Sequence, residues 1–242
     1  MDLFKTWLVE TPIAHRGLHG KNVPENSLLA FSKAIEKGYA IEFNVQMLAD
    51  GTLVLFNDES LARMTGNDGY LKYLHKEDLK ALTLKGTKEH IPTLEQALEL
   101  VDGKVPLLIE IKNPYKVGKI EQAVIDVLKK YKGEFAVQSF NPYSVGYFKK
   151  HAPNFVRGQL SSYFKGEKLN FFKKLVLRRM SLNKKVSEPH FINYEESALP
   201  NRYVKKYKNL PLLAHVVKSK EEYLKVVKYC DNIVFENFDP EI

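Results

Sequence analysis

Short runs of β-branched, leucine and aromatic residues recur along the chain, separated by stretches in which apolar residues have helical spacing. This alternation is typical of a largely parallel sheet whose strands are joined by crossover helices. The pattern predicts strands at residues 12–15, 40–45, 53–57, 105–111, 135–139, 155–160, 191–194, 210–217 and 233–236.

These strands number one more than an eight-stranded barrel uses. The link at 46–52 is shorter than the dozen or so residues that a parallel crossover needs. We therefore expect 40–45 and 53–57 to form a hairpin. The sequence then predicts an α/β protein with a (β/α)8 TIM-barrel fold and a small insertion after the hairpin of the second and third strands, at about 58–90.

Signals for helix ends agree with this arrangement. Asn26 precedes the apolar spacing of a helix that should stop at Gly38. Thr93 and Gln96 have capping-box spacing ahead of the next helix. Because the chain carries no internal repeat, low-complexity tract or linker rich in proline and glycine, we expect a single barrel domain over residues 1–242.

Composition narrows the class of protein without changing this picture. With 44% hydrophobic and 27% charged residues, the chain has the composition of a globular protein rather than a disordered one. Its single cysteine, Cys230, cannot form an internal disulfide. The N-terminus lacks a signal-peptide pattern, and no run approaches the roughly 18 apolar residues of a membrane span. A cytoplasmic location is therefore expected.

Polar residues that could carry chemistry follow the predicted strands, where barrel active sites are built. His15 can move a proton near neutral pH, and Arg16 can hold a phosphate oxygen. Paired strand positions add oxygen ligands that suit Mg²⁺ or Ca²⁺. The pairs are Glu42 with Asn44 and Glu110 with Lys112, and Asn57-Asp58 ends the returning hairpin strand.

Structural readings compete with each of these. Glu110 could pair with Lys112, and Glu42 with Arg16, as internal ion pairs that hold no ligand. Asn57-Asp58 on its own is more typical of an Asx turn. Together, however, a histidine, an arginine, a lysine and oxygen ligands indicate a phosphate site better than a glycosidase or acyl-transfer site.

Motifs spread over the chain are similar to those of the glycerophosphodiester phosphodiesterase family. The matching stretches are Ile13-Ala-His-Arg-Gly, Pro24-Glu-Asn-Ser, Ile41-Glu-Phe-Asn-Val, Asp50-Gly-Thr-Leu-Val, Asn57-Asp58, Arg63-Met-Thr-Gly, Ile91-Pro-Thr-Leu, Leu108-Ile-Glu-Ile-Lys and Gln138-Ser-Phe-Asn. The resemblance implies a (β/α)8 barrel in which a divalent cation, Mg²⁺ or Ca²⁺, and two histidines hydrolyse a glycerophosphodiester to an alcohol and glycerol phosphate.

The resemblance also assigns roles to residues. His15 would be one acid/base histidine, and Arg16 and Lys112 would bind the phosphate of a small-molecule substrate. The metal ligands would be Glu42, Asn44 and Glu110. Two of these motifs depart from the family pattern, because Asn44 stands where the family has aspartate and Asn57 where it has the second histidine.

These departures predict weak or altered turnover. Asn44 brings one negative charge fewer to the cation, and Asn57 cannot transfer a proton, a function worth about 10²- to 10⁴-fold in rate. The sequence therefore supports an impaired phosphodiesterase of lipid metabolism. The alternative is a catalytically disabled barrel that binds phosphodiesters or lipid headgroups at a membrane surface. His215, on a later strand, is expected to be structural.

A basic segment stands apart from the site. Residues 165–185 hold eight Lys or Arg against one acid, whereas the rest of the chain is nearly neutral. Phe171, Phe172, Leu175 and Met180 can share a helical stripe there. The segment is either an interfacial helix on anionic lipid or a barrel helix whose stripe packs inward. No nucleic-acid motif is present, and neither nucleic acid nor a protein partner is expected.

Overall fold

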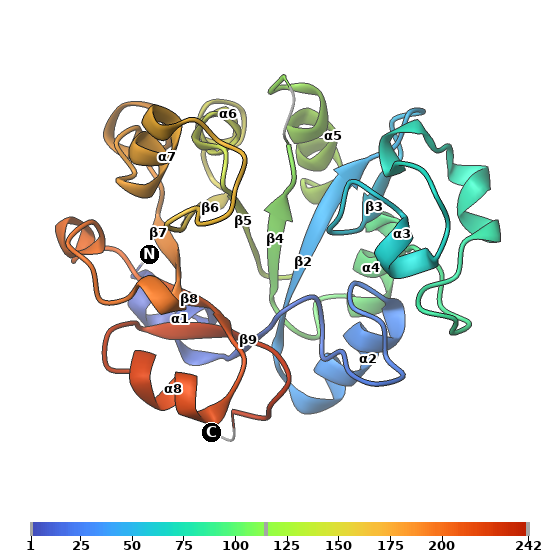
Figure 1. The fold of residues 1–242 in the computed structure, drawn as a ribbon, viewed down its shortest axis with the longest axis horizontal. Coiled ribbons are helices and arrows are strands. Elements are labelled where there is room, and N and C mark those ends of the chain that lie inside the picture. The colour runs from blue at the N-terminus through green and yellow to red at the C-terminus, as the bar shows by residue number, and fades with distance from the viewer. Residues whose placement is uncertain (1, 114–115, 241–242) are drawn as a thin grey trace. The chain divides into compact units, whose positions relative to one another are not determined.

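The predicted strands all form, and the fold is the (β/α)8 barrel (Figure 1). The computed structural model describes residues 2–113 and 116–240. Its strands are β1 (Ile13–Ala14), β2 (Ala40–Met47), β3 (Leu53–Leu55), β4 (Leu107–Ile111), β5 (Phe135–Ser139), β6 (Val156–Ser161), β7 (Phe191–Glu195), β8 (Leu212–Val217) and β9 (Asn232–Phe235). Its α-helices are α1 (Trp7–Glu10), α2 (Leu28–Lys37), α3 (Ala62–Thr65), α4 (Leu94–Val101), α5 (Lys119–Leu128), α6 (Pro142–His151), α7 (Phe171–Arg178) and α8 (Lys220–Val226).

The chain divides into two compact units, residues 14–135 and residues 1–13 with 136–242. In the first unit, β2 pairs in parallel with β4, which places Asn44 opposite Glu110. On its other side β2 pairs antiparallel with β3, with Val45 opposite Leu55. The expected hairpin is therefore confirmed, because residues 46–52 make a tight reversal rather than a crossover.

Residues 58–90 fold onto the hairpin around a core of their own. They form α3 and two 3-10 turns, Leu71–Tyr73 and Lys76–Ala81. Buried apolar side chains from this segment pack with others from the hairpin and with Ile91, which precedes α4. The cluster consists of Leu48, Val54, Phe56, Leu61, Met64, Leu71, Leu79, Leu82, Leu84 and Ile91. Burial of such a cluster stabilises the segment against the entropy of an otherwise long loop.

The ends of α2 correct one sequence expectation. Its N-cap is Ser27, whose hydroxyl accepts from the backbone N–H of Ala30, rather than Asn26. Asn26 has a φ of 55° and turns its side chain elsewhere. Gly38 ends the helix in the left-handed conformation, as predicted, and Thr93 and Gln96 form the expected capping box of α4.

Gly17 combines a φ of 78° with a close approach to α2. A Cβ at this position would lie 2.8 Å from the Ala30 Cβ and 2.9 Å from the Ala30 backbone carbon. Gly17→Ala should therefore lower the free energy of unfolding by about 2–3 kcal/mol in urea titrations. Gly38→Ala is the matched control, since its φ is 71° with no atom within 4 Å, and it should cost only about 1 kcal/mol. Equal losses would rule out the contact with Ala30.

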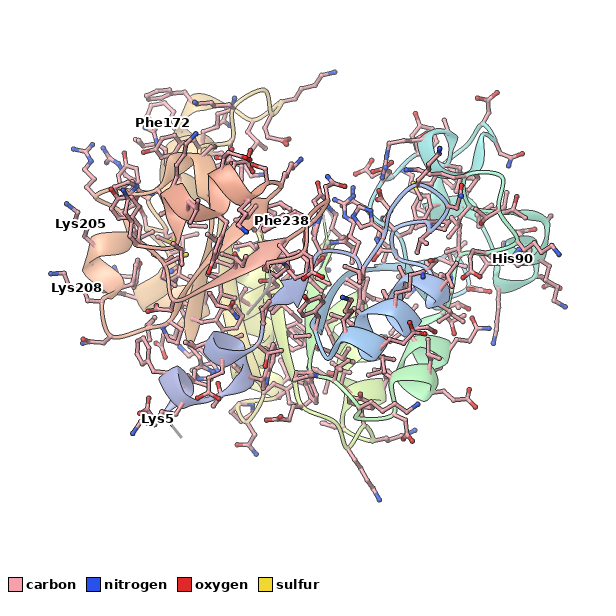
Figure 2. The ribbon with its side chains drawn as sticks, turned by 90° about the horizontal axis from the view of Figure 1, so that it is seen from below. Lys5, His90, Phe172, Lys205, Lys208 and Phe238 are labelled. Carbon is pink, nitrogen blue, oxygen red and sulfur yellow. The ribbon has the colours of Figure 1, made fainter. Side chains whose placement is uncertain are left out.

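In the second unit, β5 to β9 pair in chain order, and β6, β7, β8 and β9 are all parallel to their neighbours. α6 packs inward through Val145 and Phe148, whereas Phe172 of α7 projects to the outside (Figure 2). His215 on β8 hydrogen-bonds through Nδ1 with Asn193 Oδ1 at 2.9 Å. It also meets the Phe140 ring edge to face. The side chain of His215 thus lies beside Asn193 and Phe140 of the same unit.

Candidate active site

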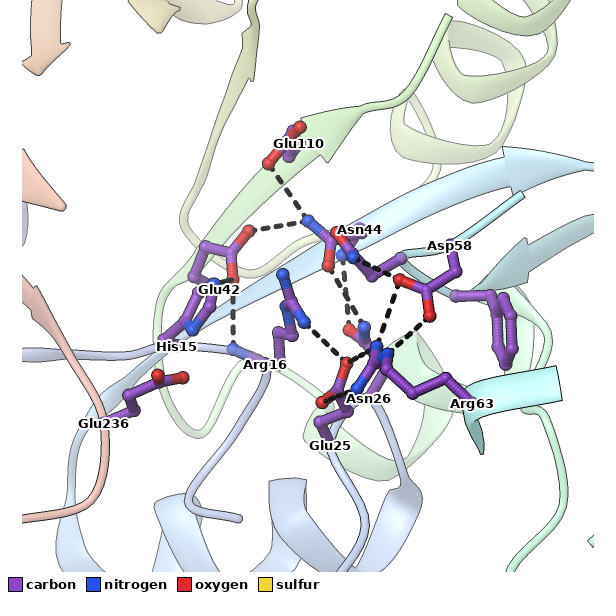
Figure 3. A network of polar contacts seen from close by, with 12 residues as sticks. His15, Arg16, Glu25, Asn26, Glu42, Asn44, Asp58, Arg63, Glu110 and Glu236 are labelled. Atoms are coloured by element: carbon purple, nitrogen blue, oxygen red, sulfur yellow. Dashed lines mark hydrogen bonds and ion pairs between the residues drawn. The ribbon is translucent and has the colours of Figure 1, made fainter. Parts of the chain in front are cut away.

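All seven residues predicted for the site come together in the unit of residues 14–135 (Figure 3). Each lies on a strand or just after its carboxyl end. His15 and Arg16 follow β1, Glu42 and Asn44 lie on β2, Asn57 follows β3, and Glu110 and Lys112 lie on and after β4.

Two glutamates and an asparagine form the buried part of the site. Glu42 and Asn44 alternate on the same face of β2, and the parallel register brings Glu110 beside them. The Asn44 amide nitrogen donates to Glu42 Oε1 at 3.2 Å and to Glu110 Oε2 at 3.0 Å. All three residues are at most 8% exposed. Asn44 therefore bridges two buried carboxyl groups through its N–H donors.

Asn26 fixes the orientation of the Asn44 amide. The Asn44 backbone N–H donates to Asn26 Oδ1 at 3.3 Å, and a backbone N–H cannot act as an acceptor. The Asn26 amide nitrogen is therefore the group that faces the Asn44 side chain, and it donates to Asn44 Oδ1 at 3.1 Å. Turning the Asn44 amide around would place two N–H groups against each other and would break the bonds to both glutamates.

Burial and charge act on Glu42. Desolvation first, and then the neighbouring carboxylate of Glu110, raise the pKa of Glu42 to about 8. The charges of Arg16 and Lys112 and a hydrogen bond of 3.0 Å from the Arg16 backbone N–H oppose this rise but do not overcome it. Burial beside a second carboxyl group thus disfavours the charged form of Glu42.

Asn57 is also held at both ends. The Lys112 ammonium donates to Asn57 Oδ1 at 3.2 Å, and the Asn57 amide nitrogen donates to Asp58 Oδ1 at 2.7 Å. Since an ammonium has no acceptor and a carboxylate has no donor, these neighbours settle the orientation of the amide. The Lys112 ammonium additionally lies 3.6 Å from Glu110 Oε1, so the Glu110–Lys112 ion pair that competed with a ligand site is present.

Glu25 joins two arginines on the other side of the site. Its carboxylate accepts from Arg16 Nη1 at 2.6 Å and from Arg63 Nη1 and Nη2 at 2.9 and 2.7 Å. Arg63 also pairs with Asp58. The polar contacts therefore close into a ring that runs through Arg16, Glu42, Asn44, Glu110, Lys112, Asn57, Asp58, Arg63 and Glu25. Figure 3 shows the part of this ring that runs from Asp58 through Arg63, Glu25, Arg16, Glu42 and Asn44 to Glu110.

The two arginines make Glu25 a pH-dependent part of the fold. Burial acts to raise the pKa of Glu25, but the hydrogen bonds and charges of Arg63 and Arg16 outweigh it and lower the pKa from 4.5 to about 2. A carboxyl group whose pKa is lower in the folded than in the unfolded protein stabilises the fold at pH values above its unfolded pKa. This stabilisation is lost as the pH falls from 4.5 towards 2. Glu25→Gln should thus lower the free energy of unfolding by about 2 kcal/mol at neutral pH.

The difference between Glu25→Gln and the unchanged protein should shrink below pH 4.5 and vanish near pH 2. Urea titrations over this range measure it. Glu36→Gln, on the exposed face of α2, is the matched control and should change stability little at any pH. A difference for Glu25→Gln that did not depend on pH would contradict the ion-pair explanation.

A second imidazole accompanies His15. The ring of His19 lies 6.4 Å from that of His15, edge to face, and a nitrogen of each ring lies within 4.8 Å of the other. His15 Nε2 itself is 3.9 Å from Glu42 Oε2. No sequence motif assigns a role to His19, whose only signal is its position four residues after His15.

The side chains of Glu42, Asn44 and Glu110 are the candidate ligands of a divalent cation. Glu42 and Glu110 direct oxygens at one point, because both accept from the same amide nitrogen. Buried carboxylate oxygens are ligands that Mg²⁺ and Ca²⁺ prefer. Asn44 presents N–H groups to that point, and its oxygen faces Asn26. The two glutamates therefore fit a cation, and Asn44 in this orientation does not.

A pocket of about 610 Å³ opens beside Lys112. Its wall mixes lysines with apolar side chains, including Lys72, Lys116, Lys119, Met47, Leu48, Val117 and Ile120. The pocket thus adjoins the polar ring at Lys112 and has room for a group of several heavy atoms.

The sequence points to seven of the nine ring residues and leaves out Glu25 and Arg63. Of the two ion pairs considered as alternatives to a ligand site, Glu110–Lys112 is present, whereas Glu42 meets the backbone of Arg16 and the Arg16 guanidinium pairs with Glu25 instead. Glu25, Asn26 and Arg63 were quoted only as parts of motifs. The available signal was that these residues stand in the Pro-Glu-Asn-Ser and Arg-Met-Thr-Gly motifs.

The structure is a (β/α)8 barrel whose polar ring gathers at the carboxyl ends of its strands, where the active sites of such barrels are built. The family model described as the glycerophosphoryl diester phosphodiesterase family matches residues 15–230. The chain belongs to this family, which agrees with the resemblance found in its motifs.

Relatives of known name support this assignment. The chain is 40% identical over 159 residues to a glycerophosphodiester phosphodiesterase of Caldanaerobacter subterraneus subsp. tengcongensis, a match that covers 61% of this chain and 65% of the relative. It is 30% identical over 171 residues to one of Bacillus subtilis, covering 61% of this chain and 58% of the relative. The matches therefore span less than two thirds of the relatives' own length.

Solved structures extend the likeness over nearly the whole chain. An Oleispira antarctica phosphodiesterase, solved with the product sn-glycerol-3-phosphate, has a TM-score of 0.78 at 25% identity over 93% of this chain and 92% of that one. A Thermotoga maritima glycerophosphodiester phosphodiesterase has a TM-score of 0.72 at 24% identity over 93% and 94% of the two chains, which shows the shared fold.

Proposed function

We propose that the chain hydrolyses a glycerophosphodiester to an alcohol and glycerol phosphate, with turnover reduced by Asn44 and Asn57. Membership of the family and the names of the relatives support the reaction. The observation that carries the proposal is the ring of polar contacts, in which Arg16 and Lys112 gather beside two buried glutamates, with His15 next to the ring at Glu42.

Arg16 and Lys112 are proposed to bind the phosphate of the substrate. Their side chains are 18% and 30% exposed, so both can be reached from solvent. Each is held by a carboxylate, Arg16 by Glu25 and Lys112 by Glu110, which orients the cationic groups before a substrate binds. Charge-assisted hydrogen bonds from such groups are the strong contacts of phosphate sites.

His15 is proposed to transfer the proton of the reaction. It lies next to Arg16 and within 3.9 Å of Glu42, so it is close to the phosphate-binding groups and to a carboxyl that can orient its ring. Asn57 occupies the place of the second histidine and cannot give a proton to the leaving alcohol. Esters of acidic alcohols, whose leaving groups need no proton, should therefore react best.

Glu42 and Glu110 are the residues proposed to hold a divalent cation, Mg²⁺ or Ca²⁺. When bound, the cation would neutralise charge on the phosphate. Because Asn44 fills the point between the glutamates with N–H donors, binding requires the loss of both of its hydrogen bonds to them. We therefore expect weak cation affinity. The pocket beside Lys112 is proposed to take the alcohol portion of the substrate.

The test is release of glycerol phosphate from a simple glycerophosphodiester with Mg²⁺, with Ca²⁺ and with chelator. We expect slow, cation-stimulated release that His15→Asn abolishes, whereas His75→Asn, an exposed histidine outside the ring, leaves the rate unchanged. If the His15→Asn variant released glycerol phosphate as fast as the unchanged chain, the proposed role of His15 would be wrong.

A disabled barrel that binds phosphodiesters is the second candidate. The observation in its favour is that both asparagine amides are engaged at each end, so the ring closes through them without a ligand. Calorimetric binding of glycerol phosphate that Arg16→Ser abolishes, together with no release under any cation condition, would favour binding alone.

A further inference from the structure

α7 presents an apolar pair to solvent. None of its eight residues is buried, and Phe171 and Phe172 at its start are 70% and 76% exposed. The two rings contact each other edge to face at 5.8 Å. In α6 of the same unit, by contrast, Val145 and Phe148 are at most 1% exposed. The expectation that the apolar stripe of this segment packs inward is therefore wrong for the phenylalanines, although Met180, beyond the helix end, is buried.

Basic side chains surround the phenylalanine pair. The segment after β7 is joined to the end of α7, because Lys206 Nζ donates to the Arg179 carbonyl at 2.6 Å and the Tyr207 hydroxyl donates to the Met180 carbonyl at 3.1 Å. We define the basic-aromatic patch as Phe171, Phe172, the basic residues Lys165, Lys168, Lys173, Lys174, Arg178, Arg179, Lys184 and Lys185, and the basic residues Arg202, Lys205, Lys206 and Lys208.

Several contacts join the two basic segments. Phe172, Lys205 and Lys208 all lie at the surface of their unit (Figure 2). Burial, followed by the nearby charges of Lys184 and Arg179, lowers the pKa of Lys206. Arg178 stacks over the rings of Tyr163 and Tyr203 at 5.9 Å from each centroid, which ties the two segments together.

This combination matches the chemistry of an anionic bilayer surface. Exposed aromatic rings enter the boundary between headgroups and acyl chains, and each Lys or Arg near the surface adds attraction to anionic lipid. Single-stranded nucleic acid would instead need a flat platform for stacking. The two rings meet at 78°, and the half-buried Leu175 and Val176 continue the apolar surface along the helix.

We propose that the basic-aromatic patch is a docking surface for anionic membranes, with Phe171 and Phe172 inserted among the lipids and the surrounding Lys and Arg side chains at the headgroups. The proposal does not depend on the hydrolytic function, since the patch and the polar ring share no residue.

Sedimentation with phosphatidylcholine vesicles, with and without phosphatidylglycerol, tests the proposal. We expect binding to the anionic vesicles only, and weaker binding as salt rises. Phe171→Ser/Phe172→Ser should weaken it at least about tenfold, and Lys173→Ser/Lys205→Ser/Lys208→Ser should do the same. The proposal would be overturned if both variants kept full binding, or if neutral vesicles were bound as well as anionic ones.

Matched variants separate docking from general charge and fold effects. Lys129→Ser/Lys130→Ser/Lys132→Ser removes the same charge from another exposed site. Leu224→Ser/Tyr229→Ser removes two other exposed apolar side chains. Both should bind vesicles normally, and weakening as large as in the patch variants would overturn the proposal. All patch variants should keep their circular dichroism spectra and any rate of glycerol phosphate release.

Two further measurements fix the source of the binding. Arg16→Ser should leave vesicle binding unchanged, because a loss there would place the lipid headgroup in the polar ring instead. In a Trp7→Phe background, Phe172→Trp should show a blue-shifted emission on anionic vesicles. An unshifted emission, or tighter binding to single-stranded RNA that survives Phe171→Ser/Phe172→Ser, would overturn insertion into lipid.

Discussion

Replacing Asn57 by histidine together with Asn44→Asp should raise the rate of glycerol phosphate release by about 10²- to 10⁴-fold with Mg²⁺ or Ca²⁺. The histidine supplies a group that can transfer a proton at the end of β3. It stands where the side chain of Asn57 now contacts Asp58 and Lys112. The aspartate supplies the missing carboxylate between Glu42 and Glu110. Release is measured against the unchanged chain under identical cation conditions.

The single variants separate the two contributions. Asn57→His alone should raise the rate only modestly, because the cation site remains bridged by the Asn44 amide. Asn44→Asp alone should improve cation affinity without restoring the second proton-transfer group. If the double variant released glycerol phosphate no faster than the unchanged chain, the assignment of these two positions to proton transfer and cation binding would be wrong.

Asn44→Asp should also make the stability of the protein depend on a cation. In chelator, the change removes the N–H donors that join Glu42 to Glu110 and leaves three buried carboxyl groups side by side. We expect the free energy of unfolding to fall by about 3 kcal/mol at neutral pH, because buried like charges are destabilising without a partner. Ca²⁺ should restore most of this loss, as urea titrations with and without the ion can measure.

The unchanged chain and Asn67→Asp serve as controls for this effect. Asn67 is exposed, so the same chemical change there should alter stability by less than about 0.5 kcal/mol and should not respond to Ca²⁺. The unchanged chain should respond only weakly to the ion. An equally strong response of the unchanged chain would mean that the Asn44 amide does not obstruct the cation site.

The strands could be predicted from the sequence because their signal is local. Alternation and the short link at 46–52 were enough to predict the hairpin of β2 and β3, and the register then follows from the side chains that must face the core. Helix ends depend on competing local signals. Asn26 and Ser27 are both good N-caps, and the choice of Ser27 follows from the partner that Asn26 finds on β2.

The sequence predicts which residues belong to the candidate site, but it does not predict which of them contact each other. Residue types and strand ends identified His15, Arg16 and the glutamates, whereas the pairing of Arg63 with Glu25 joins positions 38 apart and has no local signature. The exposure of Phe171 and Phe172 was equally inaccessible, because an apolar stripe at helical spacing looks the same whether it packs inward or faces a membrane.

The hydrogen bond from the Asn44 backbone to Asn26 has a consequence for how such a site can change. It keeps the Asn26 amide nitrogen aimed at the side chain of position 44, where an oxygen of either asparagine or aspartate can accept from it. Asn26 therefore offers the same donor to either residue, while the two neighbouring glutamates decide whether a cation is needed. A single substitution at position 44 thus exchanges a site joined through an amide for one whose stability depends on a cation, with the Asn26 contact already in place.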